Sequence, residues 1–285
     1  MGKLSNSWDL VRQSFHVLKA DKELMWLPVL SAISCVFVTS LMLLGGTLLF
    51  YPSIKAAADA NSKWQPSMEI MIGATFIFYL VNYFVIVFFN TALVGAATIR
   101  LQGGDPTVED GLRLAWQRKG IILQWAFVAA TVGMILKMIE DRASFIGRFV
   151  VGLIGLAWTL ASFLVVPILA YESVGPVEAL RRSAELFRKT WGEQVVGGIS
   201  FGLIFFFLGV PGILLPLSGF LLAGQGGLVV GMFLLLFYII LLSVVNSATH
   251  GVFVAALYRY ATTGEVAPGF HKYNFTTAWK PKGAW

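Results

Sequence analysis

Two short segments repeat a pattern of polar residues that could line a path through a membrane. N-T-A-L-V-G begins at Asn90 and N-S-A-T-H-G begins at Asn246, so both fit N-[T/S]-A-x-x-G. His250 follows Asn246 by one helical turn and shares a helix face with it. With Asn82, these side chains predict a polar path in which His250 acts as a protonation switch near neutral pH. The alternative is that they only make hydrogen bonds between helices.

Lysine and arginine side chains form a second candidate site. The segment 175–191, G-P-V-E-A-L-R-R-S-A-E-L-F-R-K-T-W, has apolar residues at helical spacing from Val177 to Trp191, with cations beside them. Such an amphipathic helix lies at a membrane surface, where its cations attract anionic headgroups. The alternative is that the helix only caps the bundle. We predict binding of lipid or a partner at Arg113, Arg118, Arg181, Arg182, Arg188 and Lys189.

The residues needed for common catalytic or metal chemistry are sparse. The three histidines occur in no H-E-x-x-H motif, which argues against a metalloprotease of that kind. An enzyme acting on lipids would need the acids Asp105, Glu109 and Glu172 to converge. We therefore expect no enzyme, with no catalytic residue, no metal and no cofactor. Cys35 is the only cysteine, so an intrachain disulfide is excluded.

Composition predicts an all-α integral membrane protein. Of 285 residues, 57% are hydrophobic and 13% are charged. A helix needs roughly 20 apolar residues to span the hydrocarbon core, and it satisfies its own backbone hydrogen bonds there. Several runs exceed this length, so we expect tilting or protrusion. The predicted spans are 24–51, 70–98, 120–139, 149–171, 195–222 and 228–258.

The distribution of charge predicts the orientation. Most Lys and Arg residues lie in four segments on one side of the membrane: before the first predicted span, after the second, after the fourth and after the sixth. This side also carries both termini. By the positive-inside rule, both termini are then cytoplasmic. The net charge of +6 is thus expected to act on anionic lipid headgroups at the cytoplasmic face, not on nucleic acid. The cations on the other side are Lys55, Lys63, Lys137, Arg142 and Arg148.

Three related segments predict an internal repeat. V-R-Q-S ends at Ser14, L-R-L-A ends at Ala115 and L-R-R-S ends at Ser183, and each precedes two spans. We predict one transmembrane domain, 1–285, built from three copies of an amphipathic cytoplasmic helix plus a transmembrane hairpin. In the first copy, the apolar stripe is Trp8, Val11, Phe15 and Leu18. The copies are 5–101, 105–171 and 175–258, followed by a cytoplasmic tail, 259–285.

Proline and glycine predict where the last spans bend and pack. Pro211 and Pro216 should kink or end the fifth span, since each removes a backbone hydrogen bond. The segment 222–228, L-A-G-Q-G-G-L, is interpreted as an outer turn. G-x-x-x-G spacings at 198–202 and 227–231 permit close approach of helices.

Four segments resemble an uncharacterised family of six-pass prokaryotic membrane proteins, known only as a domain of unknown function. They are S-W-D-L-V-R-Q-S-F-H-V-L-K-A-D-K-E-L-M-W-L-P-V-L-S, R-L-Q-G-G-D-P-T-V-E-D-G-L, Y-E-S-V-G-P-V-E-A-L-R-R-S-A-E-L-F-R-K-T-W-G-E and A-L-Y-R-Y-A-T-T-G-E-V. More distantly, the layout is similar to the membrane region attached to some glycerophosphodiester phosphodiesterases, whose catalytic domain has no counterpart here. The resemblance implies six spans in a prokaryotic cytoplasmic (inner) membrane, and it implies no activity.

Two functions follow as hypotheses. The first is a non-enzymatic polytopic membrane protein with a lipid-interacting, scaffold or assembly role, because cations gather at one face. The alternative is an oligomeric channel or transporter for a small solute, because the polar residues could line a path. A homo-oligomer is left open, and the sequence specifies no reaction.

Overall fold

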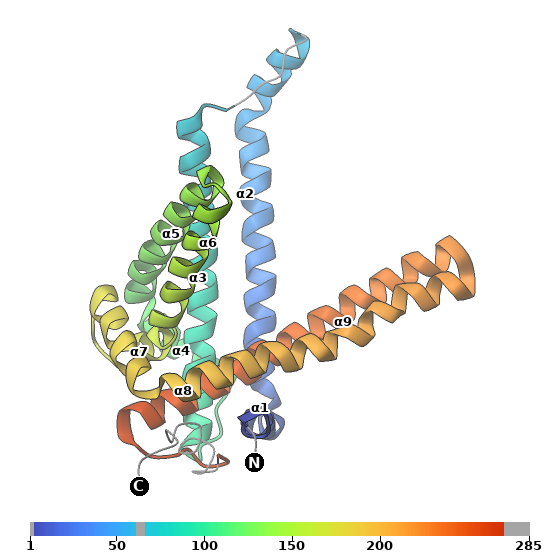
Figure 1. Ribbon diagram of the computed structural model, residues 1–285. Coiled ribbons are helices and arrows are strands. Elements are labelled where there is room, and N and C mark those ends of the chain that lie inside the picture. Colours follow the sequence, from blue (N-terminus) through green and yellow to red (C-terminus); the bar gives the residue numbers. More distant parts are fainter. Residues whose placement is uncertain (1–2, 61–65, 271–285) are drawn as a thin grey trace.

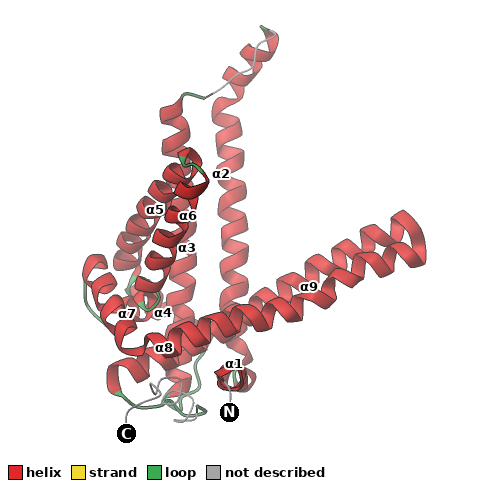
Figure 2. Cartoon of the chain, viewed as in Figure 1, coloured by secondary structure: helices red, strands yellow, loops and turns green. Residues whose placement is uncertain are grey.

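The computed structural model describes residues 3–60 and 66–270; the side chains of residues 3–8, 189–201 and 203 are not described. Within those ranges every regular element is a helix (Figure 2). The prediction of an all-helical protein is therefore confirmed.

The chain folds as a series of helices with short connections. The first helix, α1 (Lys3–Ala20), leads through the 3-10 helix η1 (Lys22–Met25) into α2 (Trp26–Asp59). The elements that follow are α3 (Met68–Leu101), α4 (Val108–Gln117), α5 (Lys119–Arg142), α6 (Phe145–Ala161), α7 (Val165–Tyr171), α8 (Pro176–Gly209), η2 (Val210–Ile213) and α9 (Leu214–Thr263).

Five segments of the described chain are long and apolar enough to cross a membrane: Lys22–Asp59, Met68–Leu101, Lys119–Arg142, Phe145–Tyr171 and Ile204–Thr263. The last has 60 residues. Its backbone leaves the helical conformation at Ala223 and Gly224, inside the predicted turn 222–228. The predicted run 195–222 is divided among the end of α8, η2 and the start of α9. The described residues thus contain five candidate spans, whereas six separate ones were predicted.

The first two spans are longer than a bilayer core requires. Helices α2 and α3 have 34 residues each. At 1.5 Å per residue, such a helix is about 51 Å long, against a hydrocarbon core of about 30 Å. Along α2, Leu27 is the one fully buried residue, and large apolar side chains face outward along most of its length. A surface of this kind suits contact with lipid.

Three pairs of helices extend from the same end of the molecule (Figure 1). The pairs are α2 with α3, α5 with α6, and α8 with α9. Helices α1 and α4 lie at this shared end, which we call the α1 end. The α8–α9 pair projects sideways from the upright helices of the other two pairs (Figure 1).

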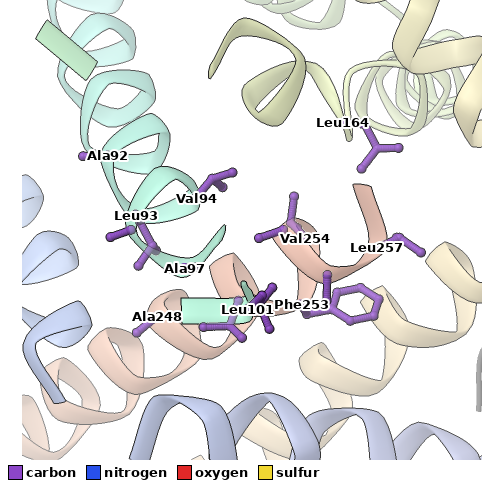
Figure 3. Packing of buried hydrophobic residues seen from close by; sticks show 14 of the residues in the cluster. Ala92, Leu93, Val94, Ala97, Leu101, Leu164, Ala248, Phe253, Val254 and Leu257 are labelled. Carbon is purple, nitrogen blue, oxygen red and sulfur yellow. The ribbon is translucent and has the colours of Figure 1, made fainter. Parts of the chain in front are cut away.

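The buried hydrophobic cluster includes the contact of α3 with α9 near the α1 end (Figure 3). Helix α3 contributes the consecutive buried residues Ala92, Leu93 and Val94, and α9 contributes Ala248 and Phe253. Small side chains at such a contact let two helix backbones come close, which is how helices associate where lipid already solvates apolar groups.

Glycines set the closest approaches in this core. A Cβ at Gly251 of α9 would collide with the Leu93 side chain of α3. A Cβ at Gly95 would lie 2.5 Å from Leu114 Cδ2 of α4, and one at Gly111 of α4 would lie 2.5 Å from the Ala92 carbonyl oxygen. Gly95 and Gly251 are the final residues of the two N-[T/S]-A-x-x-G segments. In each segment, the glycine therefore serves packing.

A second glycine contact holds together the two arms of α9 on either side of Ala223 and Gly224. A Cβ at Gly227 would collide with the backbone of Gly219, and one at Gly231 would lie 2.5 Å from the Leu215 carbonyl oxygen. The predicted close approach at 227–231 is confirmed. At the other G-x-x-x-G, Gly202 has nothing within 4 Å of a Cβ, and the Gly198 side-chain position lies outside the described residues. Pro211 lies in η2, where α8 has ended, which confirms the predicted break at this proline, whereas α9 runs through Pro216 without one.

The buried stripe of α1 differs from the predicted one. Leu10, Val11, Ser14 and Leu18 are buried, whereas Phe15 is exposed. Trp8 lies outside the described side chains. The stripe is rotated because α1 packs against both α8 and α9, so small Ser14 fits at the contact where bulky Phe15 would not.

The third amphipathic helix also differs from the prediction. Its buried residues are Ala179, Ser183 and Leu186, whereas Val177 is exposed and Trp191 lies outside the described side chains. The helix does not stop at the membrane surface, because α8 continues unbroken from Pro176 to Gly209. No proline interrupts 177–209, so nothing in the sequence ends the helix there.

We predict that Gly251→Ala destabilises the protein by about 1–3 kcal/mol, because an added methyl group overpacks the core against Leu93. Thermal unfolding in detergent measures the effect. Gly152→Ala on α6 is the matched control, since nothing lies within 4 Å of a Cβ there. Equal unfolding temperatures for the two variants would contradict this account of the α3–α9 contact.

Candidate functional site

A small polar cavity lies where α3 crosses α9. Its volume is about 160 Å³. Asn90 of α3 and Ser247 and His250 of α9 supply its polar groups, and the other lining residues are Leu93, Val94, Phe163, Val166, Gly251 and Val254. The crossing of the two N-[T/S]-A-x-x-G segments thus brings together Asn90 and His250, which are far apart in sequence. The cavity has room for a few water molecules, each of which occupies about 30 Å³ in the liquid.

Aromatic rings hold the His250 imidazole in place. Its centroid lies 5.7 Å from that of Phe163, edge to face, and 6.3 Å from that of Phe253. The ring therefore has apolar neighbours on α9 and at the α6–α7 junction, and the cavity supplies its polar surroundings. This arrangement can hold water or a small polar molecule beside an amide, a hydroxyl and an imidazole.

The other two residues of the predicted path lie elsewhere. Asn82 belongs to the contact of α3 with α2: its Oδ1 accepts a hydrogen bond from Thr39 Oγ1 at 3.4 Å, and its Nδ2 donates to the Phe78 carbonyl at 2.9 Å. Asn246 lies one turn before His250, and its buried Oδ1 has no hydrogen-bond partner in the described structure. The four residues therefore do not line a single continuous cavity.

Helix α4 has a capped first turn and carries Arg113, one of the predicted binding cations, in an ion pair. Thr107 and Asp110 cap the helix by exchanging hydrogen bonds at 3.2 and 3.0 Å. The hydrogen bonds from Thr107 lower the pKa of Asp110 below its ordinary value. Arg113 Nη2 lies 2.8 Å from Glu109 Oε1, and this hydrogen bond raises the pKa of Arg113. Both members of the pair are exposed.

The cations at the start of α8 are also paired. Arg181 lies 3.3 Å from Glu185, one turn further along the same helix. Arg182 lies 3.7 Å from Glu172, which follows α7. Arg118 donates a hydrogen bond at 3.3 Å to Ser173 Oγ, which lies with Glu172 in the connection between α7 and α8. Arg188 is exposed, and the Lys189 side chain lies outside the described residues.

A network around Glu172 was not foreseen from the sequence. Tyr258 of α9 donates a hydrogen bond to Glu172 at 2.9 Å and stacks on Tyr171 at 6.2 Å. Tyr171 in turn donates to the Gly95 carbonyl at 3.3 Å. Glu172 therefore ties α7, α8 and α9 together, while Tyr171 reaches α3. The signal was present in the segments Y-E-S-V-G and A-L-Y-R-Y, but only the fold shows that they meet.

A nearby arginine completes the α1 end. Arg259 Nη1 donates to the Leu101 carbonyl at 3.1 Å, at the last turn of α3, and Arg259 Nη2 lies 3.3 Å from Glu265. A guanidinium at a helix C-terminus satisfies a carbonyl that lacks an intrahelical partner. The end of α9 is thereby fixed to the end of α3.

Asp21, between α1 and η1, is a buried carboxyl group. It is 6% exposed, and its Oδ2 has no hydrogen-bond partner in the described part of the chain. Burial raises its pKa above the ordinary value of 3.8, and the positive charge of Arg100 opposes this effect. The carboxylate is therefore costly to the folded state at neutral pH.

Two further features bear on catalysis. The sequence interpretation passed over G-I-S-F-G at 198–202, which has the letters of the G-x-S-x-G nucleophile motif. That motif works on a sharp strand-to-helix turn, whereas 198–202 lies inside the continuous helix α8. Among the described residues, no group of three His, Cys, Asp or Glu side chains could hold a metal ion.

Comparison with known proteins yields one family. Residues 69–269 match a family described as "Family of unknown function (DUF6159)". This range takes in α3 to α9 and hence both N-[T/S]-A-x-x-G segments, while α1 precedes it. No curated protein and no solved structure matches the chain.

We predict that Asn246→Leu raises the free energy of unfolding by about 1 kcal/mol, because a buried polar atom without a partner carries an uncompensated desolvation cost. Asn82→Leu should lower it by a similar amount, since that side chain makes two hydrogen bonds. Thermal unfolding of the pair in one detergent compares them. If Asn246→Leu were the more damaging change, its amide would have a partner that this account lacks.

We predict that Asp21→Asn stabilises the protein at neutral pH by about 1 kcal/mol, since it removes a buried charge. The folded-state pKa of Asp21 is above 3.8, so its protonated form favours folding. That stability is present below pH 3.8 and is lost as pH rises through the folded-state pKa. The difference in unfolding free energy between the variant and the wild type should therefore shrink as the pH is lowered. An advantage independent of pH would refute the assignment.

Proposed function

We propose that this chain, which belongs to the DUF6159 family of unknown function, is a non-enzymatic membrane protein that binds anionic lipid headgroups through its α1 end. The observation that carries the proposal is the set of cations on and next to α4 and at the start of α8, of which Arg113, Arg181 and Arg188 are exposed, beside apolar helices of membrane-spanning length. We name this set, Arg113, Arg118, Arg181, Arg182 and Arg188 with Lys189, the cation collar.

The ion pairs of the cation collar do not prevent lipid binding. Arg113 and Arg181 pair with acids on their own helices, and more than half of each arginine side chain is exposed. Exposed ion pairs of this kind contribute little to stability. A lipid phosphate, which takes two hydrogen bonds from a guanidinium fork, can therefore replace the carboxylate.

An exposed tryptophan on α4 supports the placement of the α1 end at a membrane surface. Trp116 on α4 is 61% exposed. The Lys119 ammonium lies 4.1 Å from the centre of its ring, close enough for a cation–π interaction. Tryptophan and lysine of this kind belong at the boundary between hydrocarbon and headgroups. The α1 end would then face the cytoplasm of a prokaryote, across the inner membrane.

The placement of the acids favours a non-enzymatic role. Asp105 lies 3.6 Å from Arg100, and Glu109 and Glu172 pair with Arg113 and Arg182. Each of the three acids considered for lipid chemistry is thus paired with a different arginine.

The threefold repeat with six spans also belongs to this proposal. Ser14, Ala115 and Ser183, which the repeat aligns, are each 0% exposed. The aligned residues one turn earlier, Leu10, Gly111 and Ala179, are buried as well. The shared burial supports a common packing position in the three copies. The distant likeness to the membrane region of phosphodiesterases stays a prediction.

A channel or transporter is the second candidate. The observation in its favour is the cavity that joins Asn90, Ser247 and His250. Several copies of the chain could extend such a cavity into a pore. Solute flux into liposomes that changes with His250→Leu would support this candidate over the first.

We predict that the triple variant Arg113→Gln, Arg181→Gln, Arg188→Gln loses more than half of the anionic lipid retained by the wild type, because cations near a membrane surface attract such lipids. Native mass spectrometry of protein extracted in native-lipid nanodiscs counts the retained lipid. The matched control removes three exposed cations from the opposite end: Lys55→Gln, Arg142→Gln, Arg148→Gln. Equal lipid retention by the two triple variants would rule out the cation collar as the binding surface.

A further inference from the structure

A large cavity with both charged and apolar lining lies at the α1 end, apart from the cation collar. Its volume is about 960 Å³. Three segments line it: one face of α1, the end of α3 and the turn after it, and residues 268–270 after α9. This size is at the upper end of the range for small-molecule sites, roughly 300–1,000 Å³.

Helix α1 has two opposite faces, and the cavity uses the one that does not pack. Its lining residues are Asp9, Arg12, Gln13, His16, Val17 and Ala20, which recur every three or four positions and so share one face. The buried residues Leu10, Val11, Ser14 and Leu18 lie on the opposite face. The helix thus packs on α8 and α9 with one side and presents polar groups to the cavity with the other.

The charged groups of the cavity favour an anion. Among the described lining residues, Arg12 and Arg100 come from two different helices and Asp9 supplies one carboxylate, while Asp105 lies beside Arg100 outside the lining. His16 and Gln13 add groups that can donate hydrogen bonds. Among charged side chains, the guanidinium fork best fits the oxygens of a phosphate, because it binds two of them at once.

Arg100 is held in place yet available. Its Nη1 donates to the Gly104 carbonyl at 3.3 Å and lies 3.6 Å from Asp105, a carboxylate that is 98% exposed. A pair at this distance with one fully exposed member is weak. The remaining donors of the guanidinium can therefore reach a ligand without loss of the contact that positions it.

We propose that this cavity binds a phosphate-bearing anion between Arg12 of α1 and Arg100 of α3. The phosphate belongs either to a soluble compound or to a lipid headgroup, since Leu101 at the end of a membrane-spanning helix also lines the cavity. Phe270 and Pro268 supply apolar surface for the rest of the ligand. The site is distinct from the cation collar and does not depend on the function proposed for it.

The test uses the full-length protein and two phosphate sources. The first is inorganic phosphate, added to protein in detergent and compared with sodium chloride of equal ionic strength. The second is phosphatidic acid, included in or omitted from phosphatidylcholine nanodiscs. The unfolding temperature should rise by several degrees with at least one source. A response to phosphate in detergent identifies a soluble ligand, and a response to phosphatidic acid alone identifies a headgroup.

Four variants decide where the phosphate binds. Arg12→Gln should abolish the rise. The Arg12 side chain is exposed, so we expect this variant to fold normally. Arg100→Gln should do the same, and Asp9→Asn should enlarge the rise by removing the repelling carboxylate. Arg113→Gln, in the cation collar, should leave it unchanged. No rise with either source, or a full rise in Arg12→Gln, overturns the proposal, whatever the cation collar binds.

Discussion

The close crossing of α3 and α9 is the constraint on which the other features depend. Lipid solvates apolar side chains as well as another helix does, so such helices associate through shape and hydrogen bonds. At this crossing the missing side chain of Gly251 admits Leu93. Beside it lies the cavity of Asn90 and His250, and two turns further along α9 lies Tyr258 with its bond to Glu172. One close contact therefore positions both the buried polar groups and the network that joins four helices.

The cationic side chains at the α1 end occur in two arrangements. In the cation collar, Arg113, Arg181 and Arg182 have acids of the same or an adjoining segment beside them, as Arg113 has Glu109. In the large cavity, Arg12 and Arg100 line one recess from separate helices, with Asp9 in the same lining and Asp105 3.6 Å from Arg100. The first arrangement exchanges partners readily with a surface, because it is exposed. The second concentrates positive charge in a recess, where a bound anion makes several contacts at once.

The sequence predicted the features that depend on local chemistry. The turn at 222–228 and the break at Pro211 follow from neighbouring residues alone, and both were found. The rotation of the α1 stripe toward Ser14 did not follow, because it depends on which helices α1 contacts. The Glu172–Tyr258 bond joins residues 86 positions apart, which no local pattern encodes. The large cavity was missed for the same reason, since its walls come from three distant segments.

The α8–α9 pair also bears on how the protein enters a membrane. From Gln194 to Tyr258 the chain contains no Asp, Glu, Lys or Arg, and it reverses within this stretch at Ala223 and Gly224. The tip can therefore cross the hydrocarbon core without carrying a charge with it, unlike the connections that hold Lys55 or Arg142. For the same reason, no charge anchors the tip at the far surface. Its depth in the bilayer is set by the apolar length of the two helices and by their packing at the other end.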